Sequence, residues 1–153
     1  MSVEKVREYF RSFGAEPEIL ELGQSTATVE LAAKALGVQE DRIAKTLSFV
    51  LGEKTILVVM SGKSRIDNAK YRHFFGAKAR LVPFDQVEKL TGHKAGGVCP
   101  FAVNDGVDIF LDISLKNHQS VFPAAGSLDS AVELTIPELE KYSHFKQWVD
   151  VSK

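Results

Sequence analysis

A glycine-rich segment in the second half of the chain limits the structures that this region can adopt. Its ten residues read Gly92-His93-Lys94-Ala95-Gly96-Gly97-Val98-Cys99-Pro100-Phe101. Glycine adopts positive φ and allows close approach to its backbone, whereas proline stiffens the chain and donates no N–H. The segment therefore predicts an irregular loop with exposed main-chain groups. Two interpretations remain open: a binding loop for a small polar ligand, or a tight connection between a helix and a strand, which is commoner.

The composition indicates a single ordinary globular domain. The chain has 153 residues, of which 44% are hydrophobic and 25% are charged, and a chain of this length can build one substantial core. No internal repeat or low-complexity linker divides it, so we assign residues 1–153 to one domain. The net charge is only −1, so any surface that binds nucleic acid must be a local patch.

The single cysteine, Cys99, excludes an internal disulfide and is typical of a protein kept in a reducing cytoplasm. The residues after Met1 are Ser-Val-Glu-Lys, without the apolar segment of a signal peptide. No apolar run reaches the roughly 20 residues that a membrane-spanning helix needs. We therefore expect a cytoplasmic protein without membrane contact.

Hydrophobic periodicity and breaker residues predict mixed α and β structure. Turn signals at residues 52–54 and 104–106 indicate hairpins, and capping boxes start helices at Asp85 and Thr135. This pattern favours one α+β domain with a mixed, mostly antiparallel sheet that is curved or barrel-like and surrounded by helices. The expected helices cover residues 2–13, 29–36, 67–75 and 85–92, with a last one from Thr135. The expected strands cover residues 18–22, 45–51, 55–60, 79–82, 101–103, 107–113, 120–122 and 131–134.

Lys45 occupies an unusual place in the strand expected at residues 45–51. Alternation puts Lys45 on the same face as Leu47, Phe49 and Leu51, which are all apolar. Because lysine is rarely buried, its side chain must either extend to solvent or lie at the rim of a cavity. In the second case its ammonium would attract an anion more strongly than in open water. The residues alone leave both interpretations open.

Residues 63–80 carry an excess of positive charge. This segment contains six lysines and arginines but only one acidic residue, Asp67. A solvated helix face is the commoner explanation of such a run, and a landing patch for a phosphate backbone is the functional one. The six cations are Lys63, Arg65, Lys70, Arg72, Lys78 and Arg80.

The sequence does not contain the usual patterns of a catalytic centre. The four histidines do not pair at metal-ligand spacing, and one cysteine cannot complete a zinc site. There is no Gly-x-Ser-x-Gly nucleophile elbow, and Asp105, Asp108 and Asp112 form no recognised acid pair. Cys99 is near His93 in the chain, but a small apolar filler is the better explanation of it. We therefore expect no metal and no cofactor, so an enzyme of this kind would depend on backbone groups, a lysine and the substrate itself.

Three stretches, in order along nearly the whole chain, carry the pattern of a known family. The first contains Ser25-Thr26, Ala32-Ala33-Lys34-Ala35-Leu36-Gly37 and Ile43-Ala44-Lys45-Thr46-Leu47. The second runs from Gly92 to Phe101 and contains a Gly-x-x-x-Pro signature as Gly96 to Pro100. The third is Phe122-Pro123-Ala124-Ala125-Gly126-Ser127, followed by a strand and the Thr135 capping box. Together they resemble the YbaK family, which is similar to the editing domain inserted in bacterial prolyl-tRNA synthetases.

The resemblance implies an activity, namely hydrolysis of the ester that joins a wrong amino acid, such as alanine or cysteine, to a transfer RNA that accepts proline. It implies that Lys45 contacts the phosphate or ribose of the terminal adenosine, and that the loop from Gly96 to Pro100 holds the aminoacyl group through its backbone. Water would be the nucleophile, helped in some members by the neighbouring ribose hydroxyl. The implied catalytic residues are therefore Lys45, Gly96 and Pro100. The implied substrate-binding residues are Thr46, Gly97, Val98, Cys99, Gly126, Ser127, Ser25 and Thr26.

Three functions remain open at this point. The first is a trans-acting aminoacyl-tRNA deacylase, whose partner is aminoacyl-tRNA, with an aminoacyl-tRNA synthetase as a further partner. The second is a non-catalytic module of the same fold that binds transfer RNA or a synthetase without turnover. The third is an enzyme for a small amino-acid ester or amide, whose activity would not depend on salt because no phosphate contacts are made.

Overall fold

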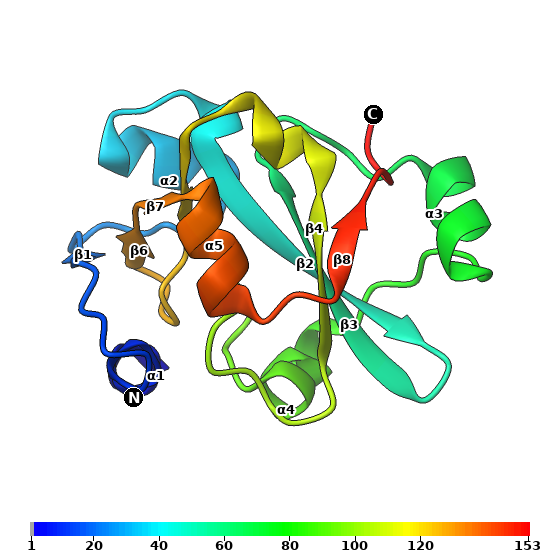
Figure 1. The fold of residues 1–153 in the computed structure, drawn as a ribbon, viewed down its shortest axis with the longest axis horizontal. Helices are drawn as coiled ribbons and strands as arrows, with labels where there is room; N and C mark the ends of the chain where they lie inside the picture. The colour runs from blue at the N-terminus through cyan, green and yellow to red at the C-terminus, as the bar shows by residue number, and fades with distance from the viewer. Residues whose placement is uncertain (1) are drawn as a thin grey trace.

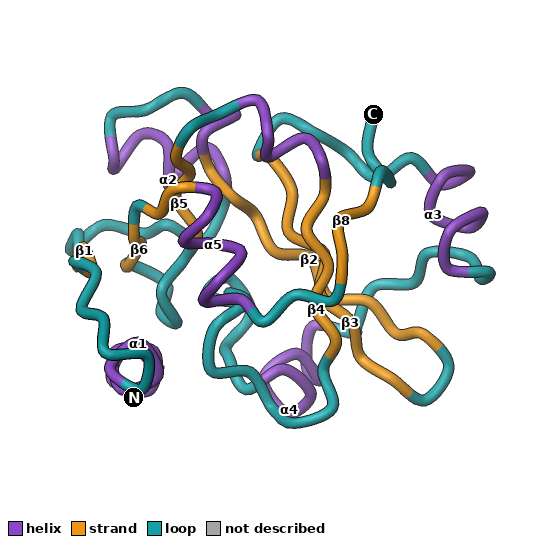
Figure 2. Tube along the Cα trace, viewed as in Figure 1, coloured by secondary structure: helices purple, strands orange, loops and turns teal. Residues whose placement is uncertain are grey.

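The protein is built around a curled, mixed sheet, with its helices arranged around it (Figures 1 and 2). The computed structural model describes residues 2–153. The α-helices are α1 (Ser2–Arg11), α2 (Val29–Leu36), α3 (Asn68–Phe75), α4 (Val87–Thr91) and α5 (Ile136–Ser143). The strands are β1 (Ile19–Glu21), β2 (Ile43–Leu51), β3 (Lys54–Ser61), β4 (Asp108–Asp112), β5 (Ser120–Pro123), β6 (Ser130–Val132), β7 (Leu134–Thr135) and β8 (Gln147–Val149). Six of them form the main sheet in the order β7-β5-β2-β3-β4-β8, and β1 and β6 form a small second sheet.

The β2–β3 hairpin forms the centre of the main sheet. Its antiparallel register runs from Ala44 opposite Ser61 to Leu51 opposite Lys54, and Gly52 makes the turn with φ of 63°. Side chains of β3 enter the core on both faces, since Leu57 belongs to one buried cluster and Val58 to another. The strand is therefore central and covered on both faces.

The remaining strand pairs make the sheet mixed. The pairs β2–β5, β3–β4 and β4–β8 are parallel, whereas β5–β7 and β1–β6 are antiparallel. The predicted single α+β domain with a curled, mixed sheet is confirmed. Three of the five strand pairs in the main sheet are parallel, whereas a mostly antiparallel sheet was expected, because β4, β5 and β8 each join the sheet after a long connection rather than through a hairpin.

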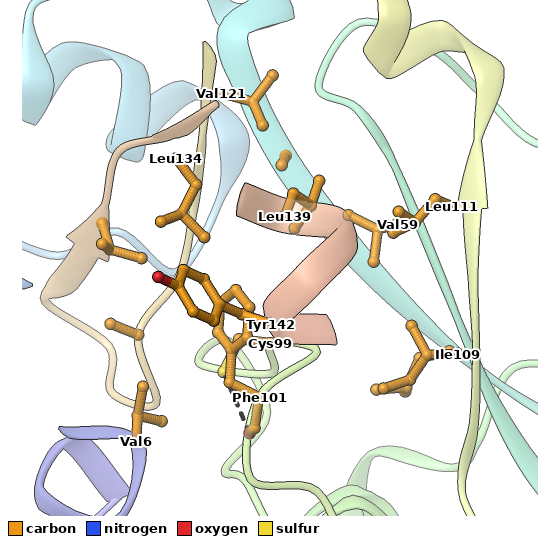
Figure 3. Close-up of a cluster of buried hydrophobic side chains, with 14 of the residues drawn as sticks. Val6, Val59, Cys99, Phe101, Ile109, Leu111, Val121, Leu134, Leu139 and Tyr142 are labelled. Atoms are coloured by element: carbon orange, nitrogen blue, oxygen red, sulfur yellow. Dashed lines mark hydrogen bonds between the residues drawn. The ribbon is translucent and has the colours of Figure 1, made fainter. Parts of the chain in front are cut away.

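The larger core cluster lies between the main sheet, α1 and α5. Figure 3 shows that Leu139 of α5 lies on the side of Val59 and Leu111 of the sheet, whereas the ring of Tyr142 extends toward Leu134. On the opposite face of β3, Tyr71 of α3 packs with Phe49, their ring centroids 5.0 Å apart. The sheet therefore has a packed layer on each side, and its backbone is fixed at the place where the candidate site lies.

A side chain caps the start of three α-helices, one of them at the predicted capping box of Thr135. Thr28 caps α2, Asp67 caps α3, and Thr135 forms a complete capping box with Glu138 at the start of α5. The box predicted at Asp85 is wrong. Residues Phe84–Gln86 form a short 3₁₀ turn instead, and α4 begins only at Val87, without a side-chain cap.

Two predicted strands are also wrong. Residues 101–103 are a loop, because Asn104 folds back onto α4, its main-chain N–H donating to the Thr91 carbonyl and its side chain to the Lys89 carbonyl. The hairpin predicted at residues 104–106 is therefore a turn between a loop and β4. Residues 79–82 form only one isolated bridge, from Leu81 to Phe49, before Pro83 ends the pairing.

Candidate functional site

A cavity of about 550 Å³ opens beside β2. Its floor is residues 43–48 of β2, and its walls come from the start of α2, the segment 81–87 and the glycine-rich loop at residues 95, 96 and 98. Most of the lining is apolar and small, including Ala27, Ala32, Ala44 and Ala95. Residues 122, 124, 130 and 131 complete the lining, so segments far apart in the sequence enclose one space that is large enough for a small organic group.

The cavity lies at a gap in the pairing of β2. β5 pairs with β2 only at Ile43 and Ala44, and the next neighbour on that side begins where the Val82 N–H donates to the Ser48 carbonyl. Within the part of the chain that the structure describes, residues 45–47 have no strand on this edge. Backbone groups of alternate residues point to the same edge, so those of Thr46 face the gap between these two contacts. A ligand in the cavity can therefore reach main-chain groups of a rigid strand.

Lys45 lies at the rim of this cavity. The side chains of Leu47, Phe49 and Leu51 pack together in the core cluster around Tyr71, as alternation predicted. The half-buried Lys45 ammonium instead donates hydrogen bonds to two carbonyls of the β3–α3 connection, those of Gly62 (3.2 Å) and Ser64. Lys45 also lines the cavity, so the rim interpretation left open by the sequence describes its position.

The surroundings of Lys45 disfavour the protonated, positively charged form of its side chain. Burial of the ammonium is the main cause that lowers the pKa of Lys45, and the nearby positive charge of Arg65 lowers it further. An anion beside the Lys45 ammonium would offset both effects, because opposite charge stabilises the protonated form. The arrangement is therefore suited to a negatively charged group such as a phosphate.

Thr46, the next residue, offers an unused polar group. Its Oγ1 atom is buried and has no hydrogen-bond partner within residues 2–153, and Thr46 lines the same cavity. Nearby, the Thr26 hydroxyl donates a long bond of 3.5 Å to the Ser130 carbonyl. Because buried polar groups are nearly always paired, the free Thr46 hydroxyl indicates a place for a polar ligand atom.

The glycine-rich loop packs tightly against two other segments. Gly96 has φ of 89°, and a Cβ built on it would lie 2.7 Å from Leu128 Cδ2 and 3.2 Å from the Ala27 Cβ. A Cβ on Gly97 would lie 2.9 Å from the main-chain carbon of Ser127. Glycine is required at both places, at Gly96 by conformation and contact and at Gly97 by contact alone.

The part of the loop after Val98 turns into the core. Cys99 is fully buried, and burial raises the pKa of its thiol to about 12. The His93 Nε2–H donates to the Phe101 carbonyl at 2.6 Å, and Cys99 Sγ is 3.5 Å from the same nitrogen. Since Nε2 carries a proton that is already donated, it cannot accept one from the thiol. The pair is a packing arrangement and not a nucleophile with its base, in agreement with the filler interpretation of Cys99.

A second, more polar cavity of about 710 Å³ lies on the other side of the Gly96–Leu128 contact. It is lined by Ser25, Gly126 and Ser127, together with Lys5 and Lys94. The Ser127 hydroxyl is occupied by bonds to Asp129 Oδ1 (2.9 Å) and to the Ser130 hydroxyl (2.7 Å). The segment that contains Ser127 and Leu128 thus packs against the glycine-rich loop at Gly96 and Gly97.

The residues expected to form the site therefore fall into three groups. Those at the first cavity are Thr26, Lys45, Thr46, Gly96 and Val98. Those at the second cavity are Ser25, Gly126 and Ser127. Those buried in or behind the loop are Gly97, Cys99 and Pro100, so these three residues affect the site through the shape of the loop rather than by contact.

Sequence reasoning missed the segment that closes one side of the first cavity. Leu81, Val82, Phe84 and Val87 line it, and Phe84 is 83% exposed. A large apolar residue directly after Pro83, in a turn, was the available signal.

The basic segment lies on the surface. All six cations are exposed, and Lys70 is paired with Asp150 at 3.0 Å. Within residues 2–153, Lys63, Arg65, Arg72, Lys78 and Arg80 form no ion pair. In the same described part, no group of three or more histidine, cysteine, aspartate or glutamate side chains is placed to hold a metal ion, and no helix is long and apolar enough to cross a membrane.

Comparison with known proteins gives the family. The model of the aminoacyl-tRNA editing domain matches residues 24–142. The chain belongs to the aminoacyl-tRNA editing domain family. The match includes Lys45 and the whole glycine-rich loop, so the resemblance to the YbaK family and the synthetase editing domain is confirmed, and with it a deacylase-type role at the level of the family.

Individual relatives and a solved structure are similar to this chain. The chain is 47% identical to the uncharacterized protein YwhH of Bacillus subtilis (strain 168), over all of this chain and 98% of that one. It is 28% identical to a proline–tRNA ligase of Lactobacillus helveticus (strain DPC 4571), over 69% of this chain but only 19% of the ligase. A crystal structure of a candidate trans-editing enzyme for prolyl-tRNA synthetase superposes with a TM-score of 0.89 at 30% identity, covering 99% of this chain and 97% of that one.

Proposed function

We propose that this protein is a trans-acting deacylase that hydrolyses the ester of mischarged, proline-accepting transfer RNA. The observation that carries the proposal is the position of Lys45. Its half-buried ammonium lies at the rim of a mostly apolar cavity, within reach of the Arg65 charge and beside the unpartnered Thr46 hydroxyl. A phosphate or ribose at the rim would place the aminoacyl ester inside the cavity. The proposal includes a cytoplasmic location, since transfer RNA is charged there.

The glycine-rich loop supplies the groups that the ester needs. The N–H groups of Gly96 and Val98 donate no backbone hydrogen bond within the described residues, whereas the Gly97 N–H donates to the Lys94 carbonyl at 2.9 Å. Free amides at a cavity wall can stabilise the negative oxygen that develops when an ester carbonyl is attacked. In the proposed reaction a water adds to the ester carbonyl carbon, the bond to the ribose oxygen breaks, and that oxygen takes a proton. The products are the free amino acid and the uncharged transfer RNA.

Small residues at the wall suit a small amino acid. The cavity is lined by several alanines and by Gly96. A difference of one methylene changes binding by only about 1–3 kcal/mol. Exclusion of proline must therefore come from the shape of the whole cavity and not from one contact. We propose alanine or cysteine as the amino acid removed.

One observation favours a second function, a non-catalytic module that binds aminoacyl-tRNA or a synthetase. Lys45 is the one titratable side chain among the described residues that line the first cavity, so no carboxylate or histidine is placed there to act as a general base. A deacylase must then use the substrate hydroxyl or a backbone carbonyl to orient the water. A binding module needs neither.

A deacylation panel distinguishes these functions. Proline-accepting transfer RNA is charged with alanine, cysteine, serine, threonine or proline, and the loss of labelled amino acid is followed with and without protein. The deacylase proposal predicts rapid loss of one small amino acid, with proline retained, and a rate that falls with added salt because phosphate contacts are weakened. Saturable binding without turnover on every member would support the binding module. Undiminished turnover of a free amino-acid ester would support an enzyme that does not need RNA.

A further inference from the structure

Phe84 is the most exposed large hydrophobic side chain in the described part of the protein, at 83%, and it stands at the mouth of the first cavity. The neighbouring Leu81, which lines the same cavity, is 60% exposed. Exposed aromatic rings beside a ligand cavity are unusual without a partner, since burial of such a ring is strongly favourable. The pair therefore marks a surface that something covers in the working protein.

The turn that carries Phe84 is fixed rather than loose. The Gln86 N–H donates to the Pro83 carbonyl at 2.9 Å, and Val87 on the next turn is buried. On the other side, the Val82 N–H donates to the Ser48 carbonyl at 3.0 Å, which ties the segment to β2. The ring is thus presented in one place relative to the strand that carries Lys45. A fixed ring loses little entropy when a flat partner stacks on it.

The charge around this surface indicates the partner. Arg80 and Lys78, on the chain segment that leads to Leu81, are exposed and form no ion pair within residues 2–153. Lys45 provides positive charge at the same cavity, and the exposed Arg65 is near enough for its charge to lower the pKa of Lys45. An aromatic platform among cations is the arrangement by which proteins hold single-stranded nucleic acid, where bases stack on rings and the backbone meets lysine and arginine.

We infer that Phe84, with Leu81 beside it, is the stacking platform for the terminal adenine of the transfer RNA. This rests on the proposed function and extends it. If the aminoacyl ester lies inside the cavity and Lys45 holds the adjoining phosphate or ribose, the base of the same nucleotide lies at the mouth. Phe84 then positions the substrate through the base, which every transfer RNA carries, and contributes nothing to the choice of amino acid.

The test uses the 3′-terminal trinucleotide with alanine joined to its last ribose by an amide, which cannot be deacylated, and with 2-aminopurine in place of the terminal adenine. Stacking on an aromatic ring quenches the fluorescence of 2-aminopurine. We expect quenching with the wild-type protein and with Phe84→Trp. With Phe84→Ala we expect a loss of affinity of about 5- to 150-fold and no quenching at saturation, since one stacked base contributes about 1–3 kcal/mol.

Phe74→Ala is the matched control, because Phe74 of α3 is also an exposed phenylalanine, at 42%, and does not line the cavity. It should bind like the wild type. Equal affinity and quenching for Phe84→Ala, in a protein that deacylates its substrate, would overturn the stacking inference alone. A wild-type protein that neither binds the trinucleotide nor deacylates any charged transfer RNA would overturn the proposed function and the inference with it.

Discussion

Gly97 and Ser127 touch through their backbones, so that the two loops around the candidate site are locked together. A Cβ on Gly97 would lie 2.9 Å from the Ser127 carbonyl carbon, 3.0 Å from its oxygen and 3.1 Å from its Cα. No flexible side chain can move aside there, because all three neighbours are main-chain atoms. The shape of the glycine-rich loop is therefore set by residues that are thirty positions later in the chain.

Gly97→Ala should destabilise the protein and impair the site. Overpacking of this kind costs about 1–3 kcal/mol, measured as the free energy of unfolding in urea. Gly106→Ala is the control, since Gly106 has φ of 87° but nothing within 4 Å of its missing Cβ. It should lose about 1 kcal/mol from backbone strain and keep full activity. A Gly97→Ala protein with wild-type stability and turnover would contradict the contact.

Removal of the Arg65 charge should raise the pKa of Lys45. Burial is the larger cause of its lowered pKa and remains in Arg65→Gln, whereas the repulsion between the two cations disappears. NMR of labelled lysine side chains would follow the titration of Lys45 in both proteins. The variant should keep Lys45 protonated to a higher pH than the wild type does. A Lys45 pKa unchanged in Arg65→Gln would mean that the two charges do not interact.

The lowered pKa of Lys45 also makes the free energy of unfolding depend on pH. Because the pKa of Lys45 is lower in the folded state than in the unfolded chain, the unfolded chain binds more protons between the two values. The free energy of unfolding should therefore gain a contribution that rises with pH through that alkaline window. Comparison of wild type with Lys45→Met, by urea unfolding at several pH values, isolates this contribution. A difference that falls with rising pH would show that the folded pKa is raised instead.

Thr46→Val should separate stability from function. The substitution keeps the shape of the side chain and removes a buried hydroxyl that has no partner within residues 2–153. An unsatisfied buried polar group is unfavourable, so the free energy of unfolding should stay the same or increase. If Thr46 binds substrate, turnover should fall by about 10-fold, the value of one hydrogen bond. Full turnover in Thr46→Val would remove this hydroxyl from the site.

Cys99 should be chemically inert in the folded protein. The thiolate is the reactive form, and burial raises the pKa of this thiol to about 12. Ellman's reagent should therefore modify Cys99 only as fast as the protein unfolds, and Cys99→Ala should retain turnover. Rapid modification of the native protein would place the thiol in a solvent-accessible cavity, contrary to the structure.

The local pattern of the chain predicts most helices and the central hairpin. Side-chain alternation and helix-capping residues report directly on backbone geometry. The sequence could therefore predict the strand at residues 45–51 and the helices that begin after Thr28, Asp67 and Thr135. The strand predicted at residues 101–103 failed because Asn104 bonds back to α4, and the capping box predicted at Asp85 failed because Phe84–Gln86 form a 3₁₀ turn there. Local signals do not contain such contacts.

The site could be predicted in part only. Lys45 is visible in the sequence because it interrupts an apolar row, and the glycine-rich loop is visible by its composition. The gap in the pairing of β2 depends on where β5 ends and where residues 81–82 begin, which no local pattern gives. The exposed Phe84 likewise becomes meaningful only when the cavity beside it is known.

The most direct test of the central claim is the single-turnover deacylation of alanyl-tRNA that accepts proline, by wild type, Lys45→Met and Lys45→Arg. We predict fast release of alanine by the wild type and a loss of about 100-fold or more in Lys45→Met, because a preorganised charge at the site is removed. Lys45→Arg should fall between them, and circular dichroism should show all three proteins folded. Wild-type release of alanine by a folded Lys45→Met protein would contradict the account, since the cavity would then act without the cation at its rim.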